Sequence, residues 1–129
     1  MNNYKLTSIL LKNVQYNFTN PDRKLISLSV YDSIKICEIF DNQAILQVNR
    51  ELSYGEKTDS YIRISYEVSV ANDEAVSKDN LSESLKNKSI NLSSVFSKIS
   101  LLISEITNLG VFGPLVTAPN YDPEKINIE

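Results

Sequence analysis

The sequence contains no histidine, and this absence removes a large part of enzyme chemistry. Without histidine there is no imidazole general base, no Ser/His or Cys/His nucleophile pair and no His-containing zinc site. The chain also has only three glycines, Gly55, Gly110 and Gly113, which cannot build a glycine-rich phosphate-binding loop. We therefore expect that the protein is not an enzyme.

Cysteine is almost absent as well. Cys37 is the only one, so no disulfide can form within the chain, which agrees with a reducing compartment. We interpret Cys37 as a small apolar filler rather than a reactive thiol. No apolar run reaches the roughly 20 residues of a membrane helix, and the first residues lack the apolar core of a signal peptide. The sequence therefore predicts a cytoplasmic protein that does not insert into a membrane.

Positive charge is neither abundant nor clustered. The formal net charge is -3 and the sequence pI is near 5.0, so the chain has no electrostatic footprint for nucleic-acid phosphates. Its hydrophobic share of 42% and charged share of 22% are ordinary for a globular protein. A chain of 129 residues can build one core, so we expect a single domain over residues 1–129 that does not bind nucleic acid.

The clearest pattern in the chain is a long amphipathic helix over residues 92–109. Its apolar side chains recur at i, i+3, i+4 and i+7, which places them on one face. They are Leu92, Val95, Phe96, Ile99, Leu102, Ile103, Ile106 and Leu109. Gly110 can adopt the left-handed conformation that ends a helix, and Pro114 and Pro119 prevent a return to helix. An extended tail over residues 110–129 is expected to follow.

Alternating apolar and polar residues predict four strands before this helix. The strands span residues 6–19, 24–31, 44–54 and 62–70. The stretch 32–42 fits neither period, so a continuing strand, an irregular crossover and a helical turn stay open, and we treat it as an apolar connector. Residues 71–90 are polar, and Asn80 followed by Glu83 resembles a helix start, so a short helix or a loop is expected there. This order predicts an α+β fold with a four-stranded antiparallel sheet within residues 6–70, covered on one face by the long helix.

Paired carboxylates are the enzymatic option that remains without histidine. Asp73 and Glu74 form the nearest pair, but they lie in a predicted loop, where nothing desolvates one partner to raise its pKa. Asp32, Glu38 and Asp41 could offer oxygen ligands, but their spacing lacks the dense carboxylates and the turn glycine of an EF-hand loop. We expect no metal site and no cofactor.

Apolar residues outside the predicted sheet and helix are more informative. The helix is expected to cover one face of the sheet, yet further apolar side chains lie in the connectors and the tail. They are Tyr31, Ile34, Ile36, Phe40, Val111, Phe112, Leu115, Val116 and Tyr121. At least half of them are expected to wrap the edges of the core. Any that remain exposed as one patch would mark a protein-binding groove or an oligomer interface.

Three segments together resemble the SecB family of protein-export chaperones. They are LKNVQYNF in the first strand, the hairpin QAILQVNRELSYGEKTDSYIRISYEVSV, and the helix and tail SSVFSKISLLISEITNLGVFGPLVTAPNY. The family's ending is a helix-stopping Gly, a Phe-containing step and an apolar LAP-N-F/Y tail. This chain reproduces it in order with Gly110, Phe112, Leu115, Ala118, Pro119, Asn120 and Tyr121. The resemblance covers residues 6 to 121.

The resemblance implies an ATP-independent holdase, a homodimer or homotetramer that binds unfolded or extended apolar segments of client proteins. The client-binding residues expected on this basis are Tyr31, Ile34, Ile36, Phe40, Phe112 and Leu115. The helix stripe offers more apolar positions than one four-stranded face needs, so an oligomer interface is expected at Phe96, Ile99, Leu102, Ile103 and Ile106. The alternative is a SecB-fold interaction protein, a mobile-element or toxin-antitoxin adaptor, which binds one specific partner without a general holdase or translocase role.

The chain departs from the family on the solvent face of the sheet, which is acidic in the export chaperones and contacts the translocation motor. Asn13, Asn17 and Arg63 stand where the family carries acids, which removes the negative charge that would steer a basic partner. The partner-facing surface of the sheet is expected at Asn13, Asn17, Tyr61 and Arg63. Docking to the translocation motor is therefore doubtful for this chain. The Cys/His zinc-binding tail of many members is absent as well.

Overall fold

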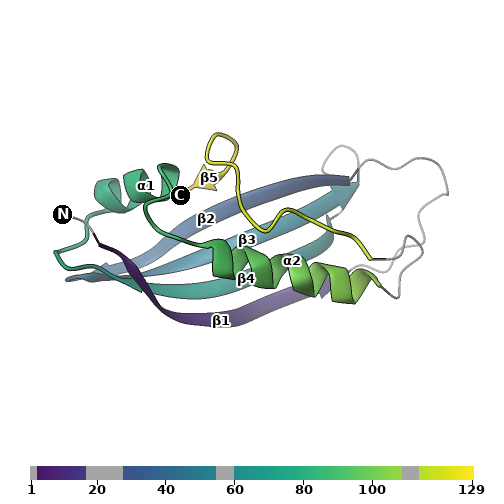
Figure 1. The fold of residues 1–129 in the computed structure, drawn as a ribbon, viewed down its shortest axis with the longest axis horizontal. Helices are drawn as coiled ribbons and strands as arrows, with labels where there is room; N and C mark the ends of the chain where they lie inside the picture. Colours follow the sequence, from purple (N-terminus) through teal and green to yellow (C-terminus); the bar gives the residue numbers. More distant parts are fainter. Residues whose placement is uncertain (1–2, 17–27, 55–59, 109–113) are drawn as a thin grey trace.

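The computed structural model describes residues 3–16, 28–54, 60–108 and 114–129. Within them the elements follow one another in the order β1 (Lys5–Tyr16), β2 (Leu28–Phe40), β3 (Gln43–Tyr54), β4 (Ser60–Ala71), α1 (Lys78–Lys86), α2 (Ser93–Thr107) and β5 (Asn127–Ile128). Figure 1 shows both helices and the tail on the same side of a long, twisted sheet. The order of strands followed by helices confirms the predicted α+β class.

The strands form one mixed sheet in the order β1-β4-β3-β2-β5. Neighbours among β1 to β4 run antiparallel, as predicted, but β5 runs parallel to β2 on its outer side. The prediction of a four-stranded antiparallel sheet is therefore wrong by one strand. The Ile36 N–H donates to the Glu129 carbonyl over 2.9 Å, and the Glu129 N–H donates to the Ile34 carbonyl over 2.9 Å. A strand of two residues shows no alternation, so periodicity could not reveal it.

The core lies between the sheet and the helices. Every second residue of β4 from Ile62 to Val70 is buried, as the alternation predicts. The facing residues of β3 and β2 and the inner sides of both helices belong to the same cluster. Helix α2 contributes Val95, Phe96, Ile99 and Ile103. Helix α2 is thus packed along most of its length. None of the described helices is long and apolar enough to cross a membrane.

Strand β1 is bulged twice, and its apolar residues follow the bulges. Its pairing with β4 shifts register between Leu6 and Ser8 and again between Leu11 and Asn13. The residues opposite the buried side of β4 are Leu6, Ile9, Leu11, Val14 and Tyr16. Each bulge inserts one residue, so the apolar side chains stay on one face although their spacing alternates between three and two. The predicted strand 6–19 is confirmed as far as Tyr16, and residues 17–19 lie outside the described residues.

The stretch left open as a connector is the second half of β2. A register shift between Ile36 and Glu38 places Ile36 opposite Leu46 and Ile39 opposite Ala44. This bulge breaks the two-residue period, which explains why the sequence pattern fitted neither helix nor strand. Cys37, expected as a small apolar filler, lies at this bulge in β2 with its side chain exposed.

The short helix has a side-chain cap, whereas the long helix has none. Residues 78–86 form a helix, and its N-cap is Ser77, whose hydroxyl accepts a hydrogen bond from the Asn80 N–H over 3.2 Å. Helix α2 starts one residue after Leu92 and ends at Thr107, with Asn108 as its C-cap. The predicted stop at Gly110 lies outside the described residues. The tail after α2 then returns along the sheet towards α1 (Figure 1).

Candidate functional site

Arg50 holds the tail against the sheet. It sits at an inward position of β3, only 1% exposed, directly opposite Asp32 in β2. The guanidinium and the carboxylate form a bidentate pair, with Nε donating to Oδ1 over 2.7 Å and Nη2 donating to Oδ2 over 2.8 Å. Planar, two-point pairing of this kind is the strong form of a charge-assisted hydrogen bond. The pair lies in the middle of the sheet face that carries the helices.

The remaining donors of Arg50 reach the tail. Nη1 donates to Thr117 Oγ1 over 3.1 Å and to the Ala118 carbonyl over 2.5 Å, and Nη2 donates to the Asn120 carbonyl over 3.0 Å. The guanidinium also lies 5.1 Å from the centre of the Phe96 ring, a cation–π distance. One buried cation therefore joins β2, β3, α2 and the tail. We call Arg50, Asp32 and the tail residues that Arg50 contacts the tail clamp.

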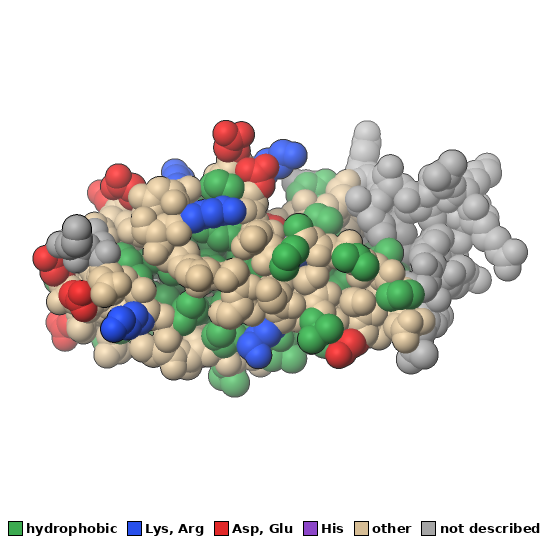
Figure 2. Space-filling view, viewed as in Figure 1, with side chains coloured by type: hydrophobic (Ala, Val, Ile, Leu, Met, Phe, Trp, Pro, Cys, Tyr) green, Lys and Arg blue, Asp and Glu red, His purple; other side chains and the backbone are tan. Residues whose placement is uncertain are grey.

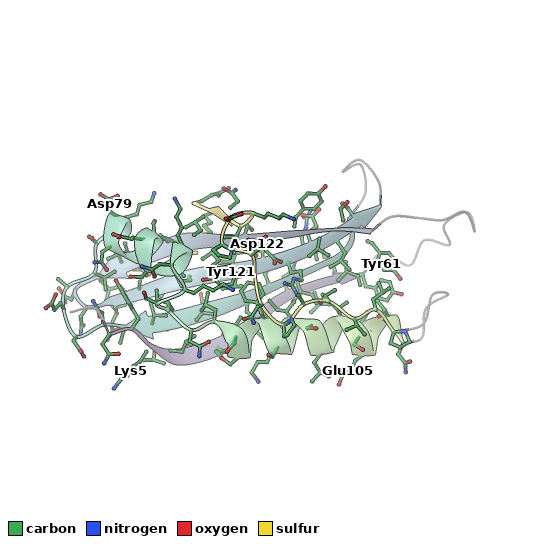
Figure 3. All side chains as sticks on the ribbon, turned by 45° about the horizontal axis from the view of Figure 1, so that its top comes forward. Lys5, Tyr61, Asp79, Glu105, Tyr121 and Asp122 are labelled. Carbon is green, nitrogen blue, oxygen red and sulfur yellow. The ribbon has the colours of Figure 1, made fainter. Side chains whose placement is uncertain are left out.

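Two further contacts fix the tail on either side of this clamp. Before it, the Ser100 hydroxyl of α2 donates to the Thr117 carbonyl over 2.6 Å. After it, the buried Tyr121 packs 5.2 Å from the Phe96 ring and donates its hydroxyl to the Leu85 carbonyl over 2.5 Å. Burial raises the pKa of the Tyr121 phenol above its ordinary value of 10.0. Figure 3 shows Tyr121 and Asp122 where the tail crosses the sheet beside α1.

The opposite face of the sheet is polar across its width. Asn13, Ser65, Asn49 and Ser33 are successive cross-strand neighbours from β1 to β2. The Ser65 hydroxyl donates to Asn49 Oδ1 over 2.6 Å, and Asn49 Nδ2 donates to Ser33 Oγ over 3.2 Å. Ser65 is only 4% exposed although it lies on this face. Such a connected network fixes the positions of its side chains.

Charges of both signs flank this polar row. Arg63 lies 3.3 Å from Glu51, and Lys12 lies 3.8 Å from Glu67, with all four side chains at least one-third exposed. Exposed pairs of this kind contribute little to stability, and they leave no strong field of one sign. The face is therefore unlike the acidic surface that characterises the export chaperones.

A hollow of about 1040 Å³ adjoins both the tail clamp and the polar face of the sheet. From the polar face it is lined by Tyr31, Asn49 and Ser65, and from the other side of β2 by Val30 and the tail residue Ile126. Alternation along β2 places Tyr31 and Val30 on opposite faces, so the hollow runs from the polar face around the outer edge of β2 to the tail. Its volume is in the range of ligand-binding clefts.

The predicted client-binding residues do not converge on one surface. Ile34 is fully buried in the core, while Ile36 and Leu115 are half-buried against it. Tyr31 and Phe40 are exposed, but nine positions along β2 separate them, which is roughly 30 Å in a strand. Phe112 lies outside the described residues. The structure therefore brings Ile34, Ile36 and Leu115 towards one core and leaves Tyr31 and Phe40 apart.

The residues predicted for the oligomer interface and for the partner-facing surface also differ in their exposure. Phe96, Ile99 and Ile103 are fully buried within this chain, whereas Leu102 and Ile106 are half-buried. Leu101, which the helical stripe excluded, is the most exposed apolar residue of α2 at 61%. On the sheet, the structure places Asn13 and Arg63 on the exposed polar face, and Asn17 lies outside the described residues.

Tyr61 is buried near the end of the sheet, as Figure 3 shows. Its hydroxyl lies 3.1 Å from that of Tyr16, and the two rings meet edge to face with centroids 5.3 Å apart. Desolvation, followed by the hydrogen bond with Tyr61, raises the pKa of Tyr16 to about 12. Tyr61 thus contacts β1 rather than lying open on the predicted partner-facing surface.

Sequence reasoning missed most of the exposed apolar surface and the whole tail clamp. Large apolar side chains are exposed on strands, helix and tail: Leu10, Leu11, Val14, Val30, Tyr31, Phe40, Leu101 and Val116. Figure 2 shows hydrophobic side chains spread over the face that carries α2 and the tail. The adjacent Leu10 and Leu11 were a usable signal, because an alternating strand cannot bury both. Arg50 was visible as the one charge at an inward position of the third strand.

Comparison with known proteins finds a likeness of fold but no relative by sequence. No protein-family model and no curated protein matches the chain. The Mycobacterium tuberculosis Rv1957 SecB-like chaperone, solved in complex with a ChAD peptide from the Rv1956 HigA1 antitoxin, superposes with a TM-score of 0.66 at 8% identity, covering 92% of this chain and 88% of that one. A Streptococcus agalactiae protein of unknown function gives a TM-score of 0.42 at 12% identity, with 92% and 98% covered. The chain therefore has a SecB-like fold.

Proposed function

We propose that the protein binds extended apolar segments of other proteins and holds them without ATP, as a SecB-like chaperone. The observation that carries this proposal is the set of large apolar side chains left exposed on β1, β2, α2 and the tail. Contiguous exposed apolar surface marks protein-binding sites, and Val30 and Tyr31 of this set line one hollow. The fold supports the proposal, because the Mycobacterium tuberculosis chaperone of the same fold was solved with a peptide bound.

We place the client contact at the hollow along β2. Val30 and Tyr31 are both exposed, and both line this hollow from opposite faces of the strand. The other residues that line the hollow are mostly polar or charged, so Val30, Tyr31 and Ile126 supply its large apolar side chains. Phe40 and Leu115 would then extend the contact only for a long client.

We further propose that the chain works as a cytoplasmic homo-oligomer and catalyses no reaction. Leu101 is exposed and Leu102 and Ile106 are half-buried along α2, so this helix retains apolar surface for a second copy. The absence of histidine supports a non-enzymatic role. The mixed charges around Arg63 and Lys12 give a basic translocation motor no acidic surface to dock on.

Aggregation of a chemically unfolded client protein tests the proposal. The wild-type chain should slow light scattering from the diluted client in the absence of ATP. The double variant Val30→Ser/Tyr31→Ser should lose this effect, while Leu10→Ser/Val14→Ser, which removes apolar side chains of similar exposure from β1, should keep it. No protection by the wild-type chain would refute the holdase function, and equal loss in both double variants would refute its placement at β2.

A second candidate is an adaptor that binds one specific partner. It is favoured by the structural neighbour, whose bound peptide comes from a single antitoxin. Affinity capture from the source cells separates the two. One partner at fixed stoichiometry would indicate an adaptor, whereas many unrelated unfolded chains would indicate a holdase.

A further inference from the structure

The strand that pairs with the outer edge of β2 covers only a small part of that edge. Strand β2 has 13 residues and β5 has two, whose partners are Ser33 and Ile34. Beyond this pairing, only the backbone bonds of Glu129 to Ile34 and Ile36 extend the contact. No other strand among the described residues lies on this side of β2. An exposed strand edge of this kind is a template for pairing with another chain.

The two edges of the sheet differ in how well they suit an added strand. Strand β1 carries two bulges and Lys12 on its edge, which are devices that discourage edge-to-edge pairing. Strand β2 pairs with β3 from Leu28 to Ile36 with no register shift. Its outer edge over these residues is therefore regular. Of these two described edges, the β2 edge offers the more regular row of backbone donors and acceptors.

The segment that pairs with β2 has the pattern of a bound peptide. Ile126 and Ile128 are half-buried against the core, while Asn127 and Glu129 are exposed. Its attachment consists of neutral backbone bonds and two half-buried isoleucines, without the charge-assisted bonds that hold the tail at Arg50. Segments with few buried contacts open first. The hollow beside it continues along the β2 edge to Val30 and Tyr31.

We propose that the β2 edge is a strand-accepting site. Strand β5 pairs with it in the free chain and is displaced when a segment of the partner protein binds. The occupant is an extended peptide that runs parallel to β2 and carries apolar side chains at alternate positions, as Ile126 and Ile128 do. Main-chain hydrogen bonds supply affinity in this mode of recognition, and alternate side chains supply specificity. The inference rests on the proposed function and adds the form of the bound segment and a competitor within the chain.

A labelled synthetic peptide with the sequence of residues 121–129 serves as the probe. Fluorescence anisotropy should show at least tenfold tighter binding to full-length Ile128→Asp than to wild type, because the charge detaches β5 and frees the edge. Asn127→Ala is the control, since that side chain contacts only the exposed Glu129 carboxylate in the described structure, and it should bind as wild type does. A scrambled peptide and a peptide with Glu129→Pro, which lacks the N–H donor, should bind at least tenfold more weakly. Equal affinities for wild type and Ile128→Asp, or for the scrambled peptide, would overturn the proposal.

Hydrogen exchange on the wild-type chain tests the same proposal without any variant. Saturating peptide should speed exchange of the Glu129 amide at least tenfold, because β5 is displaced, while the Ile36 amide stays protected by the new strand. Unchanged exchange at Glu129 would contradict displacement. A wild-type chain that protects clients but fails both peptide tests would refute the edge proposal alone, and peptide binding without client protection would refute the holdase alone.

Discussion

Replacing Arg50 with methionine should be one of the most damaging single changes in the protein. Methionine fills most of the same space but removes every donor of the tail clamp. The Asp32 carboxylate, only 12% exposed, then faces the core without a counter-charge. Removing one partner of a buried ion pair costs about 3–5 kcal/mol. The three tail acceptors add little to this, because Ala118 and Asn120 are exposed and can bond to water.

The predicted loss is large against the whole stability of such a domain, which is about 5–15 kcal/mol. For a chain of this size it corresponds to a fall in melting temperature of roughly 10–20 °C. Urea titration followed by far-ultraviolet circular dichroism measures the free energy of unfolding directly. High salt should not reproduce the effect, because a buried pair is poorly screened.

Two companion variants make the measurement decisive. Arg63→Met breaks the exposed Arg63–Glu51 pair and should cost less than about 1 kcal/mol. The double variant Arg50→Met/Asp32→Leu removes both buried charges and should recover most of the loss, since an apolar pair can replace a buried ion pair. If Arg50→Met costs less than about 1 kcal/mol, or if the double variant is no more stable than the single one, Arg50 does not act through a buried pair with Asp32.

Three further predictions concern the helix, the tyrosine pair and the bulge. Ile103→Ala should lower the free energy of unfolding by about 2–5 kcal/mol, and Leu101→Ala on the exposed side of α2 by less than about 0.5 kcal/mol; similar values from urea titration would contradict the burial of this helix. The pKa of Tyr16 is raised from 10.0 to about 12, so the folded state keeps a proton that the unfolded state loses, and stability should be constant below pH 10 and fall from pH 10 towards 12. Tyr16→Phe should reduce this slope in alkaline urea titrations, and an unchanged slope would exclude the shift. Cys37 is exposed at its bulge, so a thiol reagent should label the native chain once and as fast as it labels a free cysteine; labelling only after unfolding would contradict that placement.

The sequence predicted those parts of the fold in which local pattern and tertiary environment agree. Strand β4 alternates without interruption because its register with β3 is regular from Ile62 to Val70, and the extra residues in its pairing with β1 lie on β1. The long helix was found because its buried face recurs with the helical period. The second half of β2 was missed because the bulge at Cys37 changes the side that each later residue faces. A bulge is set by pairing with another strand, and a single strand's sequence does not display it.

The candidate site was less predictable than the fold, since it depends on which residues remain exposed. Val30 and Ile34 lie on the same face of β2 and are both apolar, yet Ile34 is fully buried and Val30 is exposed. Register and the position of β5 decide between them, and neither is encoded in the strand itself. The tail clamp likewise needs Arg50 and Asp32, 18 positions apart, to meet across two strands. A charge at an inward strand position indicates that such a partner exists but not where it lies.

The tail after α2 divides at Tyr121 into a fixed part and an exchangeable part. Up to Tyr121 it is held by hydrogen bonds to Ser100 and Leu85 and by charge-assisted bonds to Arg50, whose loss would leave the Asp32 carboxylate without its counter-charge. Beyond Tyr121 its bonds to β2 join neutral backbone groups, which a partner strand can replace one for one. Stability and recognition should therefore be separable: Arg50→Met should lower the melting temperature without tightening peptide binding, and Ile128→Asp should do the reverse. If both variants changed both properties alike, the tail would be a single cooperative unit and β5 could not be displaced without unfolding the clamp.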